Sequence, residues 1–373
     1  MSSRPPSFAS RVVSWQRRHG RHDLPWQANR DPYRIWVSEI MLQQTQVATA
    51  SAYFERFVAR FPDVAALAAA PVDDVMRLWS GLGYYARARN LHRAAQAVVE
   101  RHGGLFPLSI EEAVALPGVG RSTAAAIVAL STGEPHAILD GNVKRVLARQ
   151  FGVEGEVDSP AVLSRLWALA DSLVPRKAVQ AYTQGLMDLG ATVCTRAKPA
   201  CAGCPVRASC IALRDGRIAT LPGRKATRAT PARKVAMLAI VSRGAVLVEK
   251  RPPSGIWGGL WSLPEAPDGT DPAAWVAKRF GLRIRLVEAL APFTHAFTHF
   301  SLGVTPWIVR TERGRPTGTD AQTQWLDIGT AHAAALPAPV KKLLSRLPAG
   351  GARKGARARP GSGAGSPGGR RDR

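Results

Sequence analysis

The chain has 373 residues, which is enough for two domains with separate cores. Its formal net charge is +24, which favours a polyanionic partner, either nucleic acid or an anionic membrane surface, over a plain excess of arginine. Residues 212–234 and 349–373 together supply half of this net positive charge, because each stretch has seven basic residues and one acidic residue. No apolar run approaches the roughly 20 residues that span a bilayer, and residues 1–20 lack the core of a signal peptide. We therefore expect a cytoplasmic protein.

The first half of the chain has helical patterning and no convincing strand. Apolar residues recur at helical spacing in 38–60, and a second amphipathic run, 86–101, ends before two glycines. Ser109-Ile-Glu-Glu112 has the form of a capping box. Further helices are predicted at 121–130, 141–150, 161–173 and 178–189. Residues 1–211 therefore form a predicted helical domain.

The hydrophobic period changes in the second half. Residues 212–234 have no periodicity and predict a basic linker. Short apolar runs at 235–241 and 245–249 flank Ser242-Arg-Gly244, which predicts a hairpin. The other predicted elements are a helix at 271–280, strands at 283–290, 293–300 and 303–309, and a closing helix at 340–347. Residues 235–348 thus predict an α+β domain, and the low-complexity residues 349–373 predict a disordered basic tail.

The cysteines give the most specific pattern. All four fall within 17 residues, as C-x6-C-x2-C-x5-C. Four thiolates in so short a loop can enclose one tetrahedral metal ion or one iron–sulfur cube, and the spacing does not choose between zinc and iron. In a reducing compartment such a cluster indicates metal ligation rather than disulfides. The predicted ligands are Cys194, Cys201, Cys204 and Cys210.

A glycine-rich turn, Leu116-Pro-Gly-Val-Gly-Arg-Ser-Thr123, lies between two predicted helices. Gly118 and Gly120 permit a tight turn with exposed backbone N–H groups, and the next helix points its N-terminus at the same place. This arrangement can hold a phosphate without reading base sequence. A plain connection between helices is the alternative, but the preceding Leu-Pro favours a helix-hairpin-helix motif.

Two carboxylates are the candidate catalytic groups. Glu39 opens an apolar and amide-rich helix, and Asp140 comes just before a helix. Their ordinary roles would be a first-turn partner of the helix dipole for Glu39 and an N-cap for Asp140. The residues alone leave these alternatives open. The apolar neighbours of Glu39 favour partial burial, which would raise its pKa as a general acid requires.

In their order, these motifs resemble the MutY-type adenine DNA glycosylases of the helix-hairpin-helix, iron–sulfur glycosylase superfamily. The resemblance covers residues 15–210 and resumes in the second domain. It is carried by Leu24-Pro-Trp26, Ser38-Glu-Ile-Met-Leu-Gln-Gln-Thr45, Trp79-Ser-Gly-Leu-Gly-Tyr-Tyr-Ala-Arg-Ala-Arg-Asn90, the 116–123 turn, Leu139-Asp-Gly-Asn142 and the cysteines. It implies an all-α helix-hairpin-helix domain, built as a six-helix barrel with an iron–sulfur module, and a C-terminal α+β Nudix-like domain.

The resemblance also implies an activity: a monomer with a 4Fe–4S cluster removes adenine paired with 8-oxoguanine or guanine in double-stranded DNA. Glu39 would protonate N7 of the extruded adenine, Asp140 would stabilise the oxocarbenium-like sugar, and Asn142 would be a polar group of the catalytic site. DNA contacts are implied for Gln44, Tyr84, Gly118, Val119, Gly120 and Ser122, and adenine-pocket positions for Trp26, Gln184 and Asp188.

Ser122 distinguishes the MutY-type glycosylases from the lyase branch of the same superfamily. In the lyase branch, which includes endonuclease III, a lysine at this place attacks the sugar as an amine. A hydroxyl group cannot form a Schiff base, so we expect base removal without efficient strand cleavage. The alternatives are a pyrimidine glycosylase/lyase and a noncatalytic iron–sulfur sensor of DNA lesions. Ser122 argues against the first, and Glu39 with Asp140 argues against the second.

The second domain carries Gly255-Ile-Trp-Gly-Gly-Leu-Trp-Ser-Leu-Pro-Glu265, which resembles the Nudix-like domain of the same family. Residues 271–281 lack the glutamates that a Nudix hydrolase uses to bind metal, so we expect a recognition fold without hydrolase activity. The loop Phe297, Thr298 and His299 resembles the one that reads 8-oxoguanine, although serine is more usual in its middle. Taken by themselves, Phe297 would be a core aromatic and His299 a surface polar residue.

Overall fold

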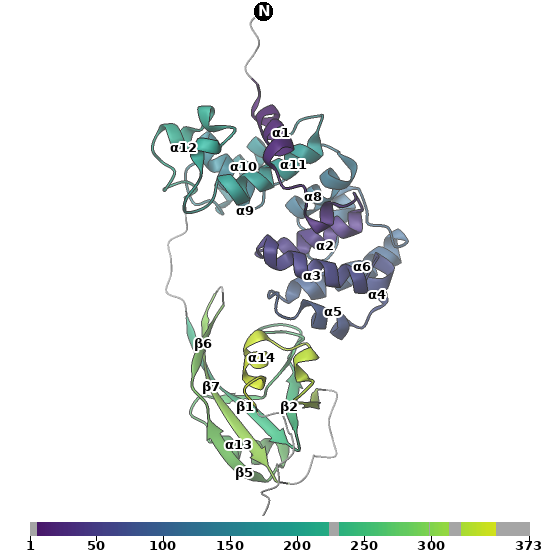
Figure 1. Ribbon diagram of the computed structural model, residues 1–373, viewed down its shortest axis with the longest axis vertical. Coiled ribbons are helices and arrows are strands. Elements are labelled where there is room, and N and C mark those ends of the chain that lie inside the picture. The colour runs from purple at the N-terminus through teal and green to yellow at the C-terminus, as the bar shows by residue number, and fades with distance from the viewer. Residues whose placement is uncertain (1–5, 224–230, 298, 313–321, 348–373) are drawn as a thin grey trace, which may run out of the picture.

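The structure is a computed structural model that describes residues 6–223, 231–297, 299–312 and 322–347. Helices form the first part of the chain, and a sheet with two helices forms the second (Figure 1). The predicted tail, 349–373, lies outside the described residues. In the described part of the chain, no helix has the length and apolar character needed to cross a membrane.

Twelve α-helices lie in the described residues up to 223. They are α1 (Phe8–His19), α2 (Pro32–Leu42), α3 (Val47–Arg60), α4 (Val64–Ala69), α5 (Val72–Trp79), α6 (Ala86–His102), α7 (Ile110–Val114), α8 (Arg121–Thr132), α9 (Gly141–Phe151), α10 (Pro160–Leu173), α11 (Val179–Asp188) and α12 (Ile211–Arg214). A 3₁₀ turn, η1 (Pro25–Gln27), precedes α2, and a π-helical turn, η2 (Leu189–Val193), follows α11.

The run of apolar residues at 38–60 is not one helix, as its spacing suggested. Helix α2 ends at Leu42 and α3 begins at Val47. Between them Gln44 has φ 57°, in the left-handed region that an α-helix of L-residues cannot contain. The periodicity continues across the break because both helices turn their apolar faces to the same core.

Helix α2 also begins earlier than the sequence suggested. Asp31 caps it, with Oδ1 accepting the N–H of Tyr33 at 3.0 Å, and Pro32 takes the first helical position. Glu39 consequently lies in the last turn of α2. The alternative role of Glu39 as a first-turn partner of the helix dipole is therefore wrong.

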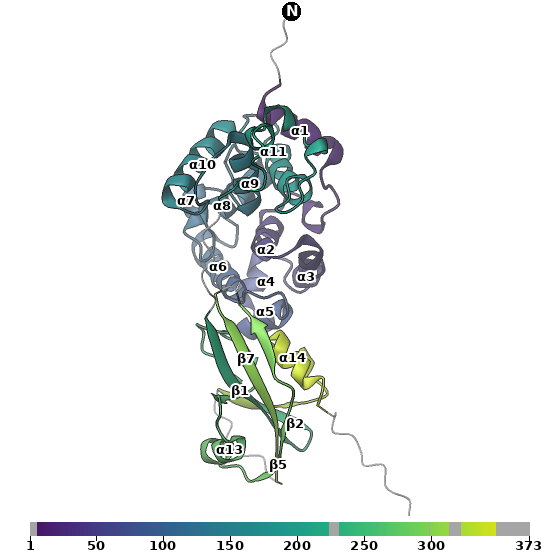
Figure 2. The same cartoon turned by 90° about the vertical axis from the view of Figure 1, so that its left-hand side faces the viewer.

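The helices enclose two cores. One gathers Trp36, Phe57 and Trp79 from α2, α3 and α5, and the other gathers Leu147 and Leu166 from α9 and α10. Helix α8 lies between the two groups, because it contacts α2 on one side and α11 on the other (Figure 2). A residue of α2 and the residue before α9 can therefore meet where the two lobes join.

The second part is an eight-stranded sheet, in the order β3-β2-β1-β7-β5, with β4 also paired to β1, β6 to β7 and β8 to β2. The strands are β1 (Ala232–Ser242), β2 (Ala245–Lys250), β3 (Trp261–Ser262), β4 (Glu265–Pro267), β5 (Ile284–Ala289), β6 (Phe293–Ala296), β7 (Ser301–Thr311) and β8 (Thr323–Asp327). β1 and β7 run parallel, and the other pairs are antiparallel.

Strand β1 is buried on both faces. Leu238 and Ile240 face the core beneath α13 (Pro272–Phe280), whereas Met237 and Ala239 face the side of α14 (Ala338–Leu344). The two helices lie on opposite sides of the sheet (Figure 2). Because successive side chains of a strand point to opposite faces, double burial produces the continuous apolar run seen in the sequence.

The segment predicted as a linker is ordered at both ends. Helix α12 reaches Arg214, and β1 begins at Ala232, where it pairs with Ser301 of β7. Backbone pairing does not require apolar side chains, so Arg233 and Lys234 join the strand without contributing to any apolar period. Residues 224–230 lie outside the described residues.

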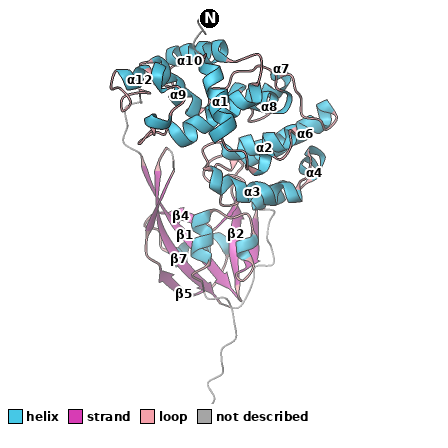
Figure 3. Cartoon of the chain, turned by 45° about the horizontal axis from the view of Figure 1, so that its top comes forward, coloured by secondary structure: helices cyan, strands magenta, loops and turns pink. Residues whose placement is uncertain are grey.

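The helical and strand-rich parts are in contact (Figure 3). Ser80 donates its hydroxyl proton to the carbonyl oxygen of Leu336 at 2.6 Å. Asp73 and Lys250 form an ion pair across the junction, and Arg89 donates to the carbonyl oxygen of Gly258. The loop between α5 and α6, which carries Tyr84, therefore lies at the contact between the two parts.

Candidate active site

Glu39 is a desolvated carboxyl group. Only part of its surface is accessible, and burial among protein atoms raises its pKa to about 8, with the charge of Asp140 adding to the rise. Within the described residues its carboxyl group makes no hydrogen bond. At neutral pH Glu39 is therefore protonated in most molecules, and its proton is not donated in a hydrogen bond to another described group. A general acid needs these properties.

Asp140 is the N-cap of α9. Its Oδ1 accepts the N–H of Val143 at 2.8 Å, so the ordinary structural role is confirmed. Burial raises the pKa of the Asp140 carboxyl group, while the N–H groups of Val143 and Asn142 and the charge of Arg145 oppose that rise. Asp140 is close enough to Glu39 for its charge to act there. The structure thus brings together two carboxyl groups that lie 101 positions apart in the sequence.

Asn142 is held beside Asp140 by a contact with η2. Its Oδ1 accepts from Arg145 at 2.7 Å, and the same guanidinium donates to the carbonyl oxygen of Gly190 at 2.7 Å. A Cβ on Gly190 would lie 2.5 Å from the Cβ of Asn142, so only glycine allows this approach. Arg145 was not predicted as part of the site, because an arginine in an amphipathic helix gives no sign of its partner.

The predicted hairpin is present between α7 and α8. Gly118 has φ 80° and makes the turn, Val119 is buried, and Gly120 is the N-cap of α8 with open space where a Cβ would lie. Ser122 lies behind this turn, where its Oγ accepts the N–H of Leu139 at 2.9 Å. The hydroxyl group of Ser122 therefore fixes the backbone just before Asp140.

The four cysteines line one pocket, together with Arg149 and Arg207. Burial raises the pKa of the Cys204 thiol to about 11, and the three other cysteines add to the rise. Among the described residues no three His, Cys, Asp or Glu side chains lie close enough together to hold a single metal ion. Four thiols that line one pocket are a donor set that either a tetrahedral metal ion or an iron–sulfur cluster can use.

Arg149 joins the cysteine loop to helix α9. It is 3% exposed and donates to the carbonyl oxygens of Thr195 and Arg196, at 2.7 and 3.1 Å, and its Nη1 lies 3.4 Å from Sγ of Cys194. Since Asp140 caps the same helix, α9 connects the candidate active site rigidly to the cysteine loop.

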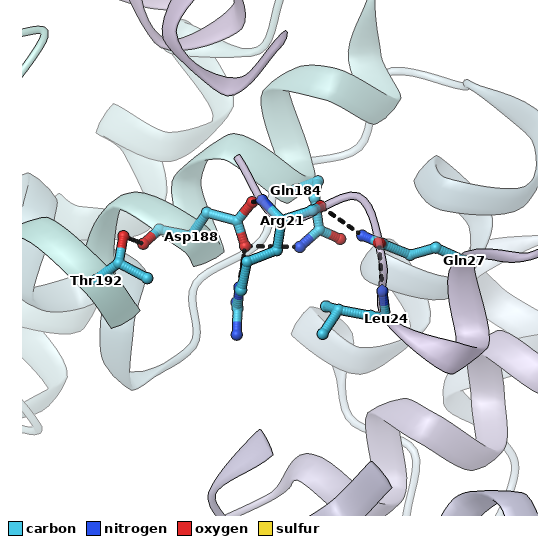
Figure 4. A network of polar contacts seen from close by, with 6 residues as sticks. All are labelled: Arg21, Leu24, Gln27, Gln184, Asp188 and Thr192. Atoms are coloured by element: carbon cyan, nitrogen blue, oxygen red, sulfur yellow. Dashed lines mark hydrogen bonds and ion pairs between the residues drawn. The ribbon is translucent and has the colours of Figure 1, made fainter. Parts of the chain in front are cut away.

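Two of the three residues predicted for an adenine pocket, Gln184 and Asp188, take part in a polar network (Figure 4). Asp188 has no exposed surface, and its Oδ1 accepts from Gln184 at 2.8 Å and from Arg21 at 2.7 Å. Its other oxygen accepts the backbone N–H of Arg21 at 2.9 Å. Both oxygens of Asp188 therefore accept hydrogen bonds within the fold, and its place in an adenine pocket stays a prediction.

Arg21 is a residue that sequence reasoning missed. Its carbonyl oxygen accepts from Gln27 at 3.2 Å, and Gln27 also accepts the backbone N–H of Leu24, which ties the turn η1 to α11 (Figure 4). Trp26 in this turn is 5% exposed, with its ring edge against Phe54 at 5.5 Å. The network therefore holds the turn containing Trp26 against the rest of the site.

A pocket of about 760 Å³ lies between the helical and strand-rich parts. It brings together Gln44 and Tyr84 from the helical part with Phe297 and His299 from the other part. Thr298 lies outside the described residues. Trp257 and Arg89 also line the pocket; both lie within motifs that carry the resemblance, but neither had been assigned a role.

The aromatic side of this pocket is stacked. The Phe297 ring lies 4.4 Å from that of Phe300 with 14° between their planes, and it contacts Trp257 at 5.7 Å. Phe297 is thus an aromatic at the edge of the core, as its alternative interpretation held, and it also lines the pocket. A flat apolar wall with histidines beside it suits a planar base.

Helix α13 of the strand-rich part does not carry the glutamates that a Nudix hydrolase uses to bind metal. Within the described residues the helix carries no acidic residue, as predicted. Glu249 pairs with Arg279 of that helix at 2.5 Å, and Glu265 pairs with Arg251 at 2.9 Å. Glutamates neutralised by arginine are poorly suited to bind a divalent metal ion.

Both parts of the chain match known families. Residues 37–171 match the family described as HhH-GPD superfamily base excision DNA repair protein, and residues 235–346 match the NUDIX domain. The adenine DNA glycosylase of Buchnera aphidicola subsp. Acyrthosiphon pisum is 35% identical over 91% of this chain and 97% of its own length. This chain belongs to the adenine DNA glycosylase family.

Mammalian adenine DNA glycosylases also align. The adenine DNA glycosylase of Mus musculus is 37% identical over 69% of this chain and 60% of that protein, and that of Homo sapiens is 31% identical over 90% and 73%. A solved thermostable thymine-DNA glycosylase shares 30% identity and a TM-score of 0.51, over 56% of this chain and 95% of its own. The predicted fold class, a helical helix-hairpin-helix part followed by a Nudix-like part with a sheet, is confirmed.

Proposed function

We propose that this chain removes adenine paired with 8-oxoguanine or guanine in duplex DNA, as a monomer. The broader statement rests on the family: the chain is an adenine DNA glycosylase, a hydrolase of N-glycosyl bonds that acts in base excision repair. The observation that carries the mechanism is the pairing of Glu39, a carboxyl group protonated at neutral pH, with Asp140, which is supplied by another helix.

In the proposed reaction, adenine leaves the base stack and enters the site beside Glu39. Glu39 donates its proton to N7 as the bond between N9 and C1′ breaks, so that the electron pair of that bond stays on a neutral base. The sugar becomes an oxocarbenium-like cation that the Asp140 carboxylate stabilises. Water then adds to C1′ and gives a proton to the Glu39 carboxylate, which restores the acid. Asn142 would orient polar atoms next to the sugar.

The proposed site for the opposing base is the pocket between the two parts. Gln44 and Tyr84 reach it from the helical side, and the wall of Phe297 and His299 faces them. A planar base fits between these groups, and the exposed turn at Gly118–Gly120 would hold a backbone phosphate of the same duplex. The strand-rich part would then read the lesion, with its Nudix-like fold contributing no hydrolysis.

We also propose that the cysteines hold a 4Fe–4S cluster. The ligands would be Cys194, Cys201, Cys204 and Cys210, which line one pocket. When bound, the cluster would contribute a structural anchor for the loop between η2 and α12. Arg149 and Arg145, both on α9, donate to the carbonyl oxygens of Thr195 and Cys194, so that anchor would steady the helix that Asp140 caps.

The proposed function predicts one result on oligonucleotides. The protein should release adenine from duplexes in which it faces 8-oxoguanine or guanine, leave adenine opposite thymine intact, and nick the strand only after alkali, because Ser122 offers no amine. Free adenine and strand breaks are measured in the same reaction. Absence of adenine release would refute the activity, and release of an oxidised pyrimidine with strand breaks would favour the lyase alternative.

A second prediction concerns the cysteines. Cys204→Ser should lose most of the bound iron and lower Tm by about 10 °C or more, since each kcal/mol lost shifts the Tm of a domain of this size by about 2–4 °C. Iron, zinc and acid-labile sulfide per chain are measured beside thermal unfolding. Ala202→Ser, an exposed change in the same loop, is the control. Wild-type protein that holds zinc and no sulfide would contradict the cluster.

A further inference from the structure

Arg87 is a buried guanidinium in the first turn of α6. It is 9% exposed and forms no ion pair within the described residues. Burial lowers the pKa of Arg87 to about 10, so it stays positively charged at neutral pH. Its charge is satisfied by oxygen atoms of the chain: Ile40 O at 2.9 Å, Met41 O at 2.8 Å, Gln43 O at 2.7 Å, Thr45 Oγ1 at 3.2 Å and Gly83 O at 3.1 Å.

These oxygens come from the end of α2 with the loop that follows it, and from the loop between α5 and α6, about 40 residues later in the sequence. Gln43 and Thr45 stand on either side of Gln44, in the break between α2 and α3. Gly83 comes immediately before Tyr84, in the loop between α5 and α6. The guanidinium carbon also lies 5.4 Å from the centre of the Tyr84 ring. The side chain of Arg87 therefore binds the backbone next to both Gln44 and Tyr84.

Gln44 and Tyr84 share an uncommon backbone conformation. Their φ angles are 57° and 49°, in the left-handed region where L side chains are crowded. Residues remain in such conformations only where the surroundings fix them. Both side chains are exposed, Tyr84 at 47%, and both face the pocket between the two parts. The strained backbone therefore presents two side chains that the fold does not bury.

We propose that Arg87 is a positioning residue that locks Gln44 and Tyr84 into one rigid unit for entry into the DNA base stack. A planar guanidinium reaches both loops at once through two nitrogens, whereas an ammonium group is a single point of contact. With the unit locked, inserting Gln44 and Tyr84 into DNA costs no ordering of either loop, so more of the binding energy goes into extruding adenine. This inference rests on the proposed function.

The test compares Arg87→Lys with a matched control on the same helix. Arg93→Lys makes the same chemical change at an exposed side chain, whose one hydrogen bond among the described residues goes to Asn90. Single-turnover adenine release is measured from adenine opposite 8-oxoguanine and from adenine opposite an abasic analogue, where extrusion costs least. Fluorescence of 2-aminopurine next to the adenine reports unstacking directly.

We expect Arg87→Lys to slow release opposite 8-oxoguanine by roughly 10–100-fold and release opposite the abasic analogue by less than about 3-fold, because misplaced groups cost most where positioning limits the rate. The 2-aminopurine signal should fall in parallel. Arg93→Lys should match the wild type on both substrates. An equal loss on both substrates, an unchanged 2-aminopurine signal, or an equal effect of Arg93→Lys would overturn the inference.

A second variant keeps the test decisive if Arg87→Lys does not fold. Thr45→Val replaces the hydroxyl group that Arg87 contacts by a methyl group of similar size. Thr45→Val should slow adenine release opposite 8-oxoguanine a few-fold and leave release opposite the abasic analogue nearly unchanged. Equal rates for this variant and the wild type opposite 8-oxoguanine would count against the inference. Wild-type protein that releases adenine from neither substrate would instead refute the proposed function.

Discussion

Glu39→Gln should slow adenine release by roughly 10²–10⁴-fold, the range expected when a general acid is lost. Glutamine has nearly the same shape, but it has no proton to give to the departing base. The wild-type rate should also fall as the pH rises above about 8, because only the protonated form of Glu39 is the acid. Single-turnover rates on adenine opposite 8-oxoguanine, between pH 6 and pH 9.5, measure both effects.

The same raised pKa makes a prediction about stability. The folded chain keeps the Glu39 proton up to about pH 8, while the unfolded chain releases it near the ordinary value of 4.5. Since the folded state binds more protons in this interval, Glu39 destabilises the fold by about 1.4 kcal/mol for each pH unit crossed. Below pH 4.5 both states are protonated and the effect vanishes.

Glu39→Gln should therefore unfold at a higher temperature than the wild type at pH 8 and at nearly the same temperature at pH 4.5. Calorimetry at the two pH values, beside the excision assay, tests both consequences of one desolvated carboxyl group. An unchanged excision rate would remove Glu39 from the mechanism. A lower Tm of the variant at pH 8 would show that the carboxyl group is not desolvated in the folded chain.

Asp140→Asn should lower the excision rate by about 10²–10³-fold while leaving the fold nearly unchanged. Asparagine can still accept the N–H of Val143, so helix α9 keeps its cap. What it lacks is the negative charge beside the sugar. Single-turnover excision and thermal unfolding of the same preparations separate the two roles of this residue.

Asp140→Ala is the matched control, because it removes both the charge and the cap. It should lose excision to the same extent and also lose about 1 kcal/mol of stability. If Asp140→Asn kept wild-type excision while Asp140→Ala lost it, Asp140 would act only as a cap. The proposed stabilisation of the sugar cation would then have to come from another group.

Patterns confined to short segments predicted the fold well. Glycines at fixed positions predicted the turn at Gly118, and Ser242-Arg-Gly244 predicted the hairpin between β1 and β2, where Arg243 and Gly244 have φ 45° and 78°. These features depend on backbone conformation within a few residues, so the local sequence is sufficient to specify them.

Side chains that reach across the fold were missed. Arg21 holds Asp188 from 167 residues away, and Arg87 reaches Ile40 from 47 residues away. In sequence each is one arginine among many in a basic chain. The partner of Asp188 was not predicted for the same reason, since nothing near it in the sequence showed that Arg21 would satisfy its carboxylate. A buried charge is defined by its partner, and partners are set by packing.

By itself, the sequence determined the two-part architecture, the cysteine loop and the identity of the carboxyl groups, because residue type, spacing and order fix these. Only the tertiary structure decided that Glu39 lies at the end of its helix, that its pKa rises to about 8, and that Asp140 stands near it. The acidity of a carboxyl group depends on how much water and which charges surround it, and these arise only when α2 and α9 meet.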